Sequence, residues 1–169
     1  MFQKIINFIN SILGRARSVY VEASPKISIP SVDNSPWLTI ARKEVGIKEY
    51  LPGDNPRIIE YHKATKLAAV TDEVPWCSAF VCWCLEKSGH ESTHSASARS
   101  FLKWGVALEK PEIGCIVIFD RGNGMGHVGF YMGEEDRGIF VLGGNQSNCV
   151  NISMYNKSKL LGYRWPSAT

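Results

Sequence analysis

Apolar and polar positions divide this chain into a helical part followed by a stranded part. Between residues 36 and 105, apolar side chains recur three and four positions apart, which is typical of amphipathic helices. From residue 113 onward, short apolar and β-branched runs alternate with turns rich in glycine and polar residues, which favours strands. Helices followed by a meander of antiparallel strands indicate an α+β domain.

Cap signals locate the individual elements. Ser35-Pro36 and Asn55-Pro56 each offer an N-cap residue followed by proline, and glycines follow the expected helix ends. We therefore expect helices over 36–46, 56–62, 75–89 and 95–105. Strands are expected over 113–119, 127–132, 139–145, 150–155 and 160–165.

The N-terminal segment, residues 1–17, has an amphipathic pattern of its own. Its apolar positions from Phe2 to Leu13 recur at helical spacing, with polar residues opposite. A helix docked on its own domain or on a partner is the favoured interpretation, and an interfacial helix that touches a membrane is the alternative. Residues 18–35 lose this periodicity and are rich in serine and proline, as in a linker. We expect the compact domain to span 36–169.

Length and composition narrow the class of protein. A chain of 169 residues suits one domain with its own core, and we expect a monomer. The net charge of +3 comes from scattered basic residues, so no nucleic-acid partner is expected. No apolar run reaches the roughly 18 to 20 residues that span a bilayer. Five cysteines are an odd number, so at least one thiol is free or paired outside the chain.

Three of the five cysteines lie within the stretch PWCSAFVCWC. Cys77 falls in the first turn of the expected helix, where unpaired N–H groups and the helix dipole favour a thiolate. Cys84 lies two turns further along the same apolar stripe, roughly 10 Å away by helix geometry, and Cys82 points to another side. Cys77 is therefore the candidate nucleophile. A zinc site formed by Cys82, Cys84, His90 and His94 is disfavoured, because these two cysteines lie on different faces of an apolar helix.

The hairpin of strands 127–132 and 139–145 brings a histidine to an asparagine. If Met132 faces Ile139 across the turn, His127 lies opposite residue 144 and beside Asn145. A cysteine nucleophile needs such a pair, an imidazole that takes and returns a proton and a polar group that orients it. With Cys77 packed at that end of the sheet, the pattern predicts a site of Cys77, His127 and Asn145.

Several motifs, taken in order, resemble a known family. They are DEVPWCSAFVCWCLEKSG, SASARS, GHVGFYMG, VLGGNQSNCV and LLGYRWP. Together they are similar to the papain-like peptidoglycan hydrolases of the CHAP and NlpC superfamily, in particular a small phage and bacterial branch. CHAP denotes cysteine- and histidine-dependent amidohydrolases and peptidases. The likeness covers about residues 36–166 and implies a papain-like fold, hydrolysis of an amide in peptidoglycan, and no cofactor or metal.

The resemblance also implies roles for individual residues. Cys77 matches the nucleophile, His127 the general base and acid, and Asn145 the residue that orients the histidine. Many CHAP enzymes carry an acidic residue two positions before that asparagine, where this chain has Gly143. Asn145 therefore acts alone or with another polar group. The expected substrate-binding residues are Trp76, Arg99 and Trp104, with Arg99 able to pair with a carboxylate of the peptide stem.

The expected reaction is that of an N-acetylmuramoyl-L-alanine amidase or of an endopeptidase of the peptide stem. No convincing signal peptide is recognised, so a phage endolysin, made in the host cytoplasm and released to the cell wall, is the favoured setting. Export without a cleaved signal peptide is the other expectation. An antibacterial effector, a non-catalytic module that binds the wall, and a cysteine enzyme acting on another protein or acyl substrate are the alternatives.

Overall fold

The computed structural model describes residues 35–167. The helix expected over 1–17 and all but the last residue of the linker expected over 18–35 lie outside the described residues. The division of the chain into helix, linker and domain therefore stays a prediction. Among the described residues, no helix has the length and apolar character needed to cross a membrane.

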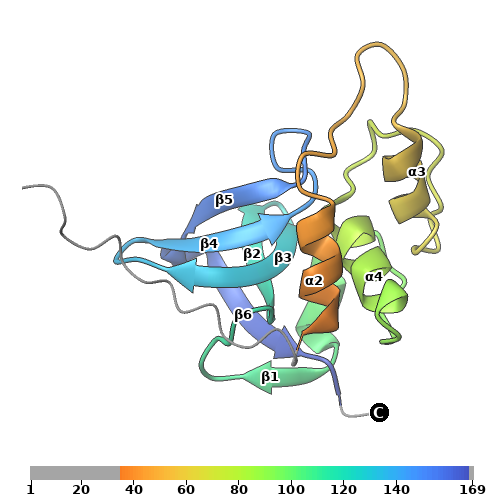
Figure 1. The fold of residues 1–169 in the computed structure, drawn as a ribbon. Helices are drawn as coiled ribbons and strands as arrows, with labels where there is room; N and C mark the ends of the chain where they lie inside the picture. Colours follow the sequence, from red (N-terminus) through yellow and green to blue (C-terminus); the bar gives the residue numbers. More distant parts are fainter. Residues whose placement is uncertain (1–34, 168–169) are drawn as a thin grey trace, which may run out of the picture. The chain divides into compact units, whose positions relative to one another are not determined.

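Helices come first along the described chain and strands follow (Figure 1). The helices are α2 (Pro36–Lys43), α3 (Pro56–His62), α4 (Cys77–Lys87) and the 3₁₀ helix η2 (Ala98–Lys103). The strands are β1 (Val106–Leu108), β2 (Ile116–Gly122), β3 (Met125–Glu134), β4 (Gly138–Gly143), β5 (Asn151–Asn156) and β6 (Leu160–Trp165), with a short 3₁₀ turn η3 (Lys157–Lys159) before the last. This order confirms the α+β fold class.

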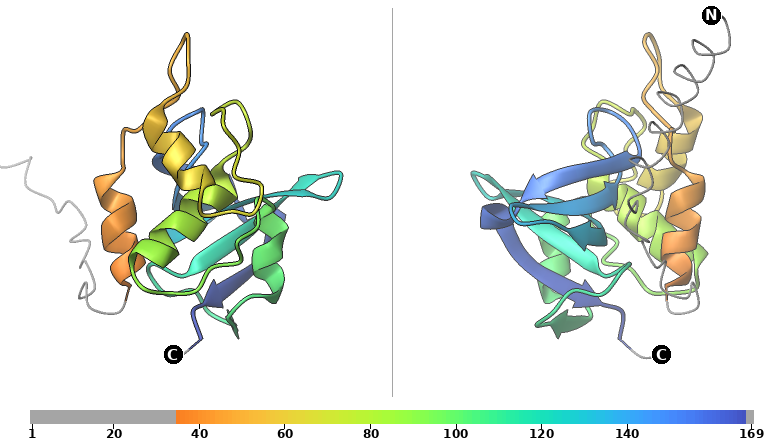
Figure 2. Two further views of the ribbon diagram at one scale, coloured as in Figure 1. Left: turned by 90° about the vertical axis from the view of Figure 1, so that its right-hand side faces the viewer. Right: turned by 60° about the vertical axis from the view of Figure 1, so that its left-hand side comes forward.

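The strands form one antiparallel sheet in the order β1-β6-β2-β3-β4-β5. Strands β2 to β5 are the expected meander, and β6 then returns to pair with β2. Strand β1 was not expected, because its three residues are mostly exposed and carry no apolar pattern. Helices α2, α3 and α4 lie together on one side of the sheet in both views of Figure 2.

Alternating residues of the sheet face two separate hydrophobic clusters. On the helix side, Val128, Phe130 and Leu142 pack against α4 and its neighbours. On the other side, Phe119, Tyr131 and Val141 belong to a second cluster. Helix α4 is buried on every side from Cys77 to Leu85, whereas the sequence pattern predicted one apolar stripe. Helix α4 is therefore the centre of the first core.

Two helix boundaries differ from the sequence expectation. Helix α4 begins at Cys77, two residues after the expected start at Pro75, with Trp76 as its N-cap. The segment expected to be helical over 95–105 forms only η2. The serine side chains before it compete for backbone N–H groups, since Oγ of Ser95 accepts a hydrogen bond from the N–H of Ser97 at 3.2 Å.

The register of the β3–β4 hairpin also differs from the expected one. Ile139 pairs with Glu134 rather than with Met132, because Gly133 and Glu134 continue the strand instead of forming the turn. A bulge between Tyr131 and Gly133 then shifts the pairing, so that further along Phe130 lies opposite Leu142. The expected register would have paired Phe130 with residue 141. The ladder ends at Phe130 and Leu142, so His127 has no partner on β4, and the observed offset points to residue 145 rather than 144.

Candidate active site

Cys77 is the first residue of α4, and its side chain is 7% exposed. The backbone N–H groups of Val128 on β3, of Ser78 and of Cys77 itself lie near the sulfur and favour its thiolate. Burial raises the pKa of the Cys77 thiol, while these N–H groups and the charge of Arg121 lower it without overcoming burial. The start of the helix thus lowers the pKa of Cys77 as expected, but burial outweighs this effect and the resting group is a neutral thiol.

His127 on β3 is fully buried, and it shares a neighbour with Cys77, since the charge of Arg121 lowers the pKa of both groups. Its Nε2 lies 3.0 Å from Oε1 of Gln146, and its Nδ1 lies 3.3 Å from a guanidinium nitrogen of Arg121. The imidazole stacks on the ring of Tyr155 from β5, with centroids 4.7 Å apart and planes 11° apart. The histidine is therefore held from three sides.

The contacts of Gln146 determine which imidazole nitrogen carries the proton. Its amide NH₂ donates to the backbone oxygens of Val141 (3.2 Å) and Asn151 (2.7 Å) and lies 3.0 Å from Oδ1 of Asn151. The amide oxygen is therefore the atom that faces His127 and can only accept. Nε2 must donate, which leaves Nδ1 as the basic nitrogen. Arg121 donates to that same Nδ1.

The surroundings of His127 keep the imidazole neutral. Burial is the largest cause and the positive charge of Arg121 the second, and together they lower the pKa of His127 to about 3. The hydrogen bond that His127 donates to Gln146 acts in the opposite direction and is weaker. At neutral pH the resting site therefore contains a neutral thiol and a neutral imidazole.

The structure assigns the orienting contact to Gln146, so the expected role of Asn145 is corrected. Within the described part of the chain, the side chain of Asn145 makes no hydrogen bond, whereas Gln146 contacts the imidazole directly. Asn145 has a φ of 55°, a turn conformation that directs the next residue inward.

Gly143 explains how a glutamine three residues further along reaches the histidine. A Cβ at this position would lie 3.4 Å from Nε2 of His127 and 3.0 Å from Oε1 of Gln146. A side chain at 143 would thus occupy the place that Oε1 of Gln146 now takes. The absence of an acidic residue at 143 was the sequence signal that another polar group serves His127, and Gln146 is that group.

The three expected substrate-binding residues do not converge on Cys77. Trp76 is fully buried and donates its indole N–H to Glu49 at 2.8 Å, so it is a core residue and cannot line a groove. Arg99 pairs with Asp120 and donates to the backbone oxygen of Met125 at 3.0 Å. Its charge is therefore already compensated, and the guanidinium joins η2 to the β2–β3 turn.

Trp104 lies near the opposite end of α4. Its indole N–H donates to the backbone oxygen of Glu91 at 3.2 Å, and Glu91 follows the C-terminus of the helix that Cys77 begins. Eleven residues of α-helix separate these ends by about 16 Å. A direct contact of Trp104 with a reacting amide at Cys77 is therefore not supported.

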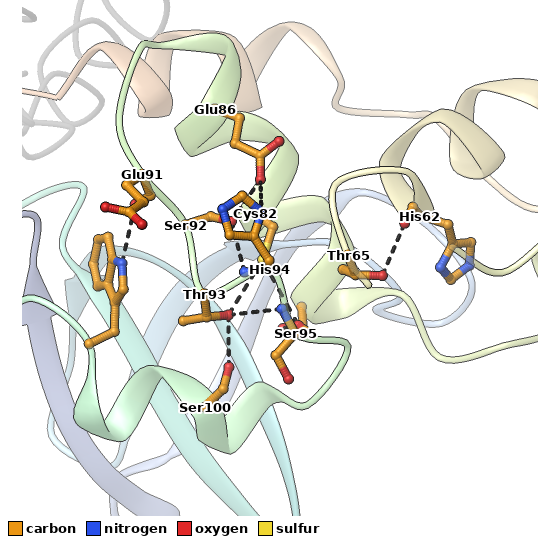
Figure 3. Close-up of polar contacts among 12 residues, drawn as sticks. His62, Thr65, Cys82, Glu86, Glu91, Ser92, Thr93, His94, Ser95 and Ser100 are labelled. Atoms are coloured by element: carbon orange, nitrogen blue, oxygen red, sulfur yellow. Dashed lines mark hydrogen bonds and ion pairs between the residues drawn. The ribbon is translucent and has the colours of Figure 1, made fainter. Parts of the chain in front are cut away.

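The loop after α4 holds the remaining polar groups that were considered (Figure 3). The sulfur of Cys82 lies 3.6 Å from Oγ1 of Thr93, which confirms that it faces away from the Cys77 stripe. His94 contacts a carboxylate oxygen of Glu86 at 3.1 Å, while His90 packs edge-on against Trp37. The two histidines thus have separate partners, and all five cysteines are free thiols.

The segment that carries Cys77 and His127 is similar to a known protein family. Residues 69–145 match the CHAP domain family, and this segment contains both Cys77 and His127. Over this segment the chain is similar to CHAP domains. The match ends at Asn145, one residue before the glutamine that contacts His127. CHAP domains are typically cysteine peptidases that act on peptidoglycan, which supports membership of a peptidoglycan hydrolase family.

Among solved structures, a protein described as similar to a lipoprotein of the NLP/P60 family, from Staphylococcus aureus subsp. aureus Mu50, is similar to this chain. The TM-score is 0.48 at 17% sequence identity, and the alignment covers 88% of this chain and 46% of that one. The chain thus spans less than half the length of that protein. No curated protein matches the chain.

Proposed function

We propose that this protein hydrolyses an amide bond of peptidoglycan, with Cys77 as nucleophile, His127 as general base and acid, and Gln146 as the positioning residue. One observation carries the proposal. The Cys77 sulfur at the start of α4 contacts the N–H of Val128, next to a histidine whose Nε2 is held by Gln146. A buried cysteine without these partners would be interpreted as a small apolar residue.

The contacts imply a sequence of proton and bond changes. The Cys77 S–H gives its proton to Nδ1 of His127, and the thiolate forms a bond to the carbonyl carbon of the amide. The C–N bond then breaks, and the departing amine takes the proton from Nδ1. Water, losing a proton to Nδ1, hydrolyses the thioester and restores the thiol. Throughout, the Nε2 proton stays on its hydrogen bond to Gln146.

The start of α4 also provides stabilisation for the oxyanion. The N–H groups of Cys77 and Ser78 lower the pKa of the thiol, and backbone N–H groups of a first helical turn lack partners within the helix. A carbonyl attacked by this sulfur develops its negative charge in the same region. The helix terminus thus serves the thiolate first and the tetrahedral intermediate afterwards.

The target amide is that of an N-acetylmuramoyl-L-alanine amidase or of an endopeptidase of the peptide stem. A phage endolysin that acts on the bacterial wall as a monomer is the proposed setting, and an antibacterial effector with the same chemistry is the alternative. The family match to CHAP supports this substrate class. A non-catalytic wall-binding module is disfavoured, because thiol, imidazole and positioning amide are all in place.

Zymography on purified peptidoglycan tests the proposal. Wild type and a Cys149→Ser control, which alters a partly exposed thiol elsewhere, should clear the gel equally, and Cys77→Ala should not clear it. Absence of clearing by wild type would contradict the hydrolase function, and clearing by Cys77→Ala would contradict the assigned nucleophile. Mass spectrometry of the released fragments identifies the bond.

A further inference from the structure

Arg121, near the end of β2, is an exposed residue whose guanidinium lies at the active site. One of its nitrogens is 3.3 Å from Nδ1 of His127 and 3.5 Å from the hydroxyl oxygen of Tyr155. Within residues 35–167, no carboxylate lies within ion-pair distance of it. The arginine therefore brings a positive charge to the reacting groups without a compensating anion.

Other arginines of the same domain show what such a charge normally binds. Arg57 pairs with Glu44 at 2.7 Å and with Glu60 at 2.8 Å, and Arg99 pairs with Asp120. The groups facing His127 are Arg121 from β2, Tyr155 from β5 and the neutral amide of Gln146, and the neutral thiol of Cys77 lies close enough to feel the charge of Arg121. None of them is anionic at rest, so the guanidinium retains the capacity to bind a carboxylate.

The position of Arg121 also blocks the proposed base. Nδ1 is the basic nitrogen of His127, and its lone pair accepts from Arg121. Among the described residues, no hydrogen bond joins the Cys77 sulfur to the imidazole, although the sulfur lies beside the next residue of the strand. Cys77 cannot pass its proton to Nδ1 until Arg121 leaves.

We infer that Arg121 binds a carboxylate of the substrate beside the scissile amide and, in doing so, leaves Nδ1 of His127 free to accept the proton of Cys77. The inference rests on the proposed function, since it takes Cys77 as nucleophile. A carboxylate presents two acceptor oxygens to the guanidinium fork and binds it more strongly than a neutral ring nitrogen does. Substrate binding and activation of the base are therefore one event.

Neutralising the guanidinium also changes the electrostatics in the required direction. The charge of Arg121 is the second cause of the low pKa of His127, so a carboxylate on Arg121 makes the imidazole a better proton acceptor. A substrate without a carboxylate at this position leaves both the hydrogen bond and the charge in place. Arg121 thereby selects acidic peptides over neutral ones.

Alkylation of Cys77 tests the inference without any cell-wall substrate. Iodoacetate and iodoacetamide both transfer their CH₂ group to the sulfur and release iodide, but only iodoacetate carries a carboxylate. Peptide mass spectrometry gives the rate of each reaction at Cys77. The rate with iodoacetate divided by the rate with iodoacetamide should fall by about tenfold or more from wild type to Arg121→Gln. Arg121→Lys should give an intermediate ratio, because it keeps the charge and loses the fork.

Two internal controls keep the alkylation result interpretable. The ratio at the partly exposed Cys149 should not change between variants, and Arg137→Gln, which alters an exposed arginine in the β3–β4 turn, should behave as wild type. Labelling of the fully buried Cys84 would identify an unfolded variant. If Arg121→Gln is unfolded, wild type is compared with Arg121→Lys instead. An unchanged ratio at Cys77 in a folded Arg121→Gln protein overturns the inference.

A second experiment separates this inference from the proposed function. Peptidoglycan is treated with carbodiimide and ammonium chloride, which converts its carboxylates to amides, and is compared with untreated material. Wild type should cleave the amidated wall about tenfold or more slowly than the untreated wall, and Arg121→Gln should cleave the two materials at similar rates. Equal cleavage by wild type overturns the role of Arg121 alone, whereas no cleavage of either material overturns the proposed function.

Discussion

Replacing Gln146 by methionine is the most direct test of the site geometry. Methionine is about as long as glutamine but cannot accept the proton on Nε2 of His127, which Gln146 now accepts at 3.0 Å. The imidazole is fully buried, so in the variant this N–H has no water to bind. We expect kcat to fall while KM stays nearly constant, because the substrate does not contact Gln146.

The size of the effect follows from the burial of the bond. Leaving a buried donor without a partner costs about 1–3 kcal/mol, which corresponds to roughly a 5- to 150-fold loss in kcat if it is felt in the transition state. The amide NH₂ of Gln146 also donates to the backbone oxygens of Val141 and Asn151. Its loss therefore lowers the free energy of unfolding as well, and urea titration must accompany the kinetics.

Asn145→Gly is the matched control for Gln146→Met. Glycine tolerates the φ of 55° at this position, so the substitution removes the side chain without straining the turn. Steady-state kinetics on soluble muropeptides should show a kcat within about twofold of wild type, since the side chain makes no contact with His127. If Asn145→Gly loses as much kcat as Gln146→Met, or if Gln146→Met retains wild-type kcat, Gln146 does not position the histidine.

Three further predictions concern stability. Gly144→Ala would place a methyl carbon 2.5 Å from the ring of Trp76, so urea titration should show a loss of about 1–3 kcal/mol. Arg57→Met leaves the buried carboxylate of Glu44 without its cation and should cost about 1–3 kcal/mol by the same measurement; no loss would contradict the ion pair. The pKa of His127, about 3 when folded and about 6.5 when unfolded, means that the unfolded chain binds the extra proton. Stability should therefore decline as pH falls from about 6.5 toward 3, and His127→Gln should remove about 1.4 kcal/mol per pH unit of that decline. Equal pH slopes for the two proteins would contradict a buried, neutral His127.

Local signals in the sequence predicted the parts of the fold that depend on neighbouring residues. The proline after Asn55 marks the start of α3, which the structure confirms, and the Asn55 side chain caps the helix as expected. Cys77 could be placed in the first turn of α4 because Pro75 marks the expected start of that helix in the same way. Strand β1 and the shortened η2 could not be predicted, because they depend on pairing with β6 and on serine side-chain bonds.

The site was predictable to the level of segments and not of every side chain. His127 and the 143–146 segment meet at one end of the sheet, as the hairpin pattern indicated. The left-handed turn at Asn145, which is followed by the buried Gln146, has no signal in the strand pattern, so register alone selected Asn145. Arg121 was missed because its role depends on a long side chain crossing from β2 to His127 on β3, which spacing along the chain does not reveal.

Gly143 has a consequence for the comparison of related sequences. A side chain at 143 and the amide of Gln146 would compete for one space beside Nε2 of His127. An acidic residue at the first position and glutamine at the second should therefore exclude one another in an alignment of such domains. The two positions are expected to covary, so that a search for one invariant third residue would overlook members in which the role has moved three residues along the chain.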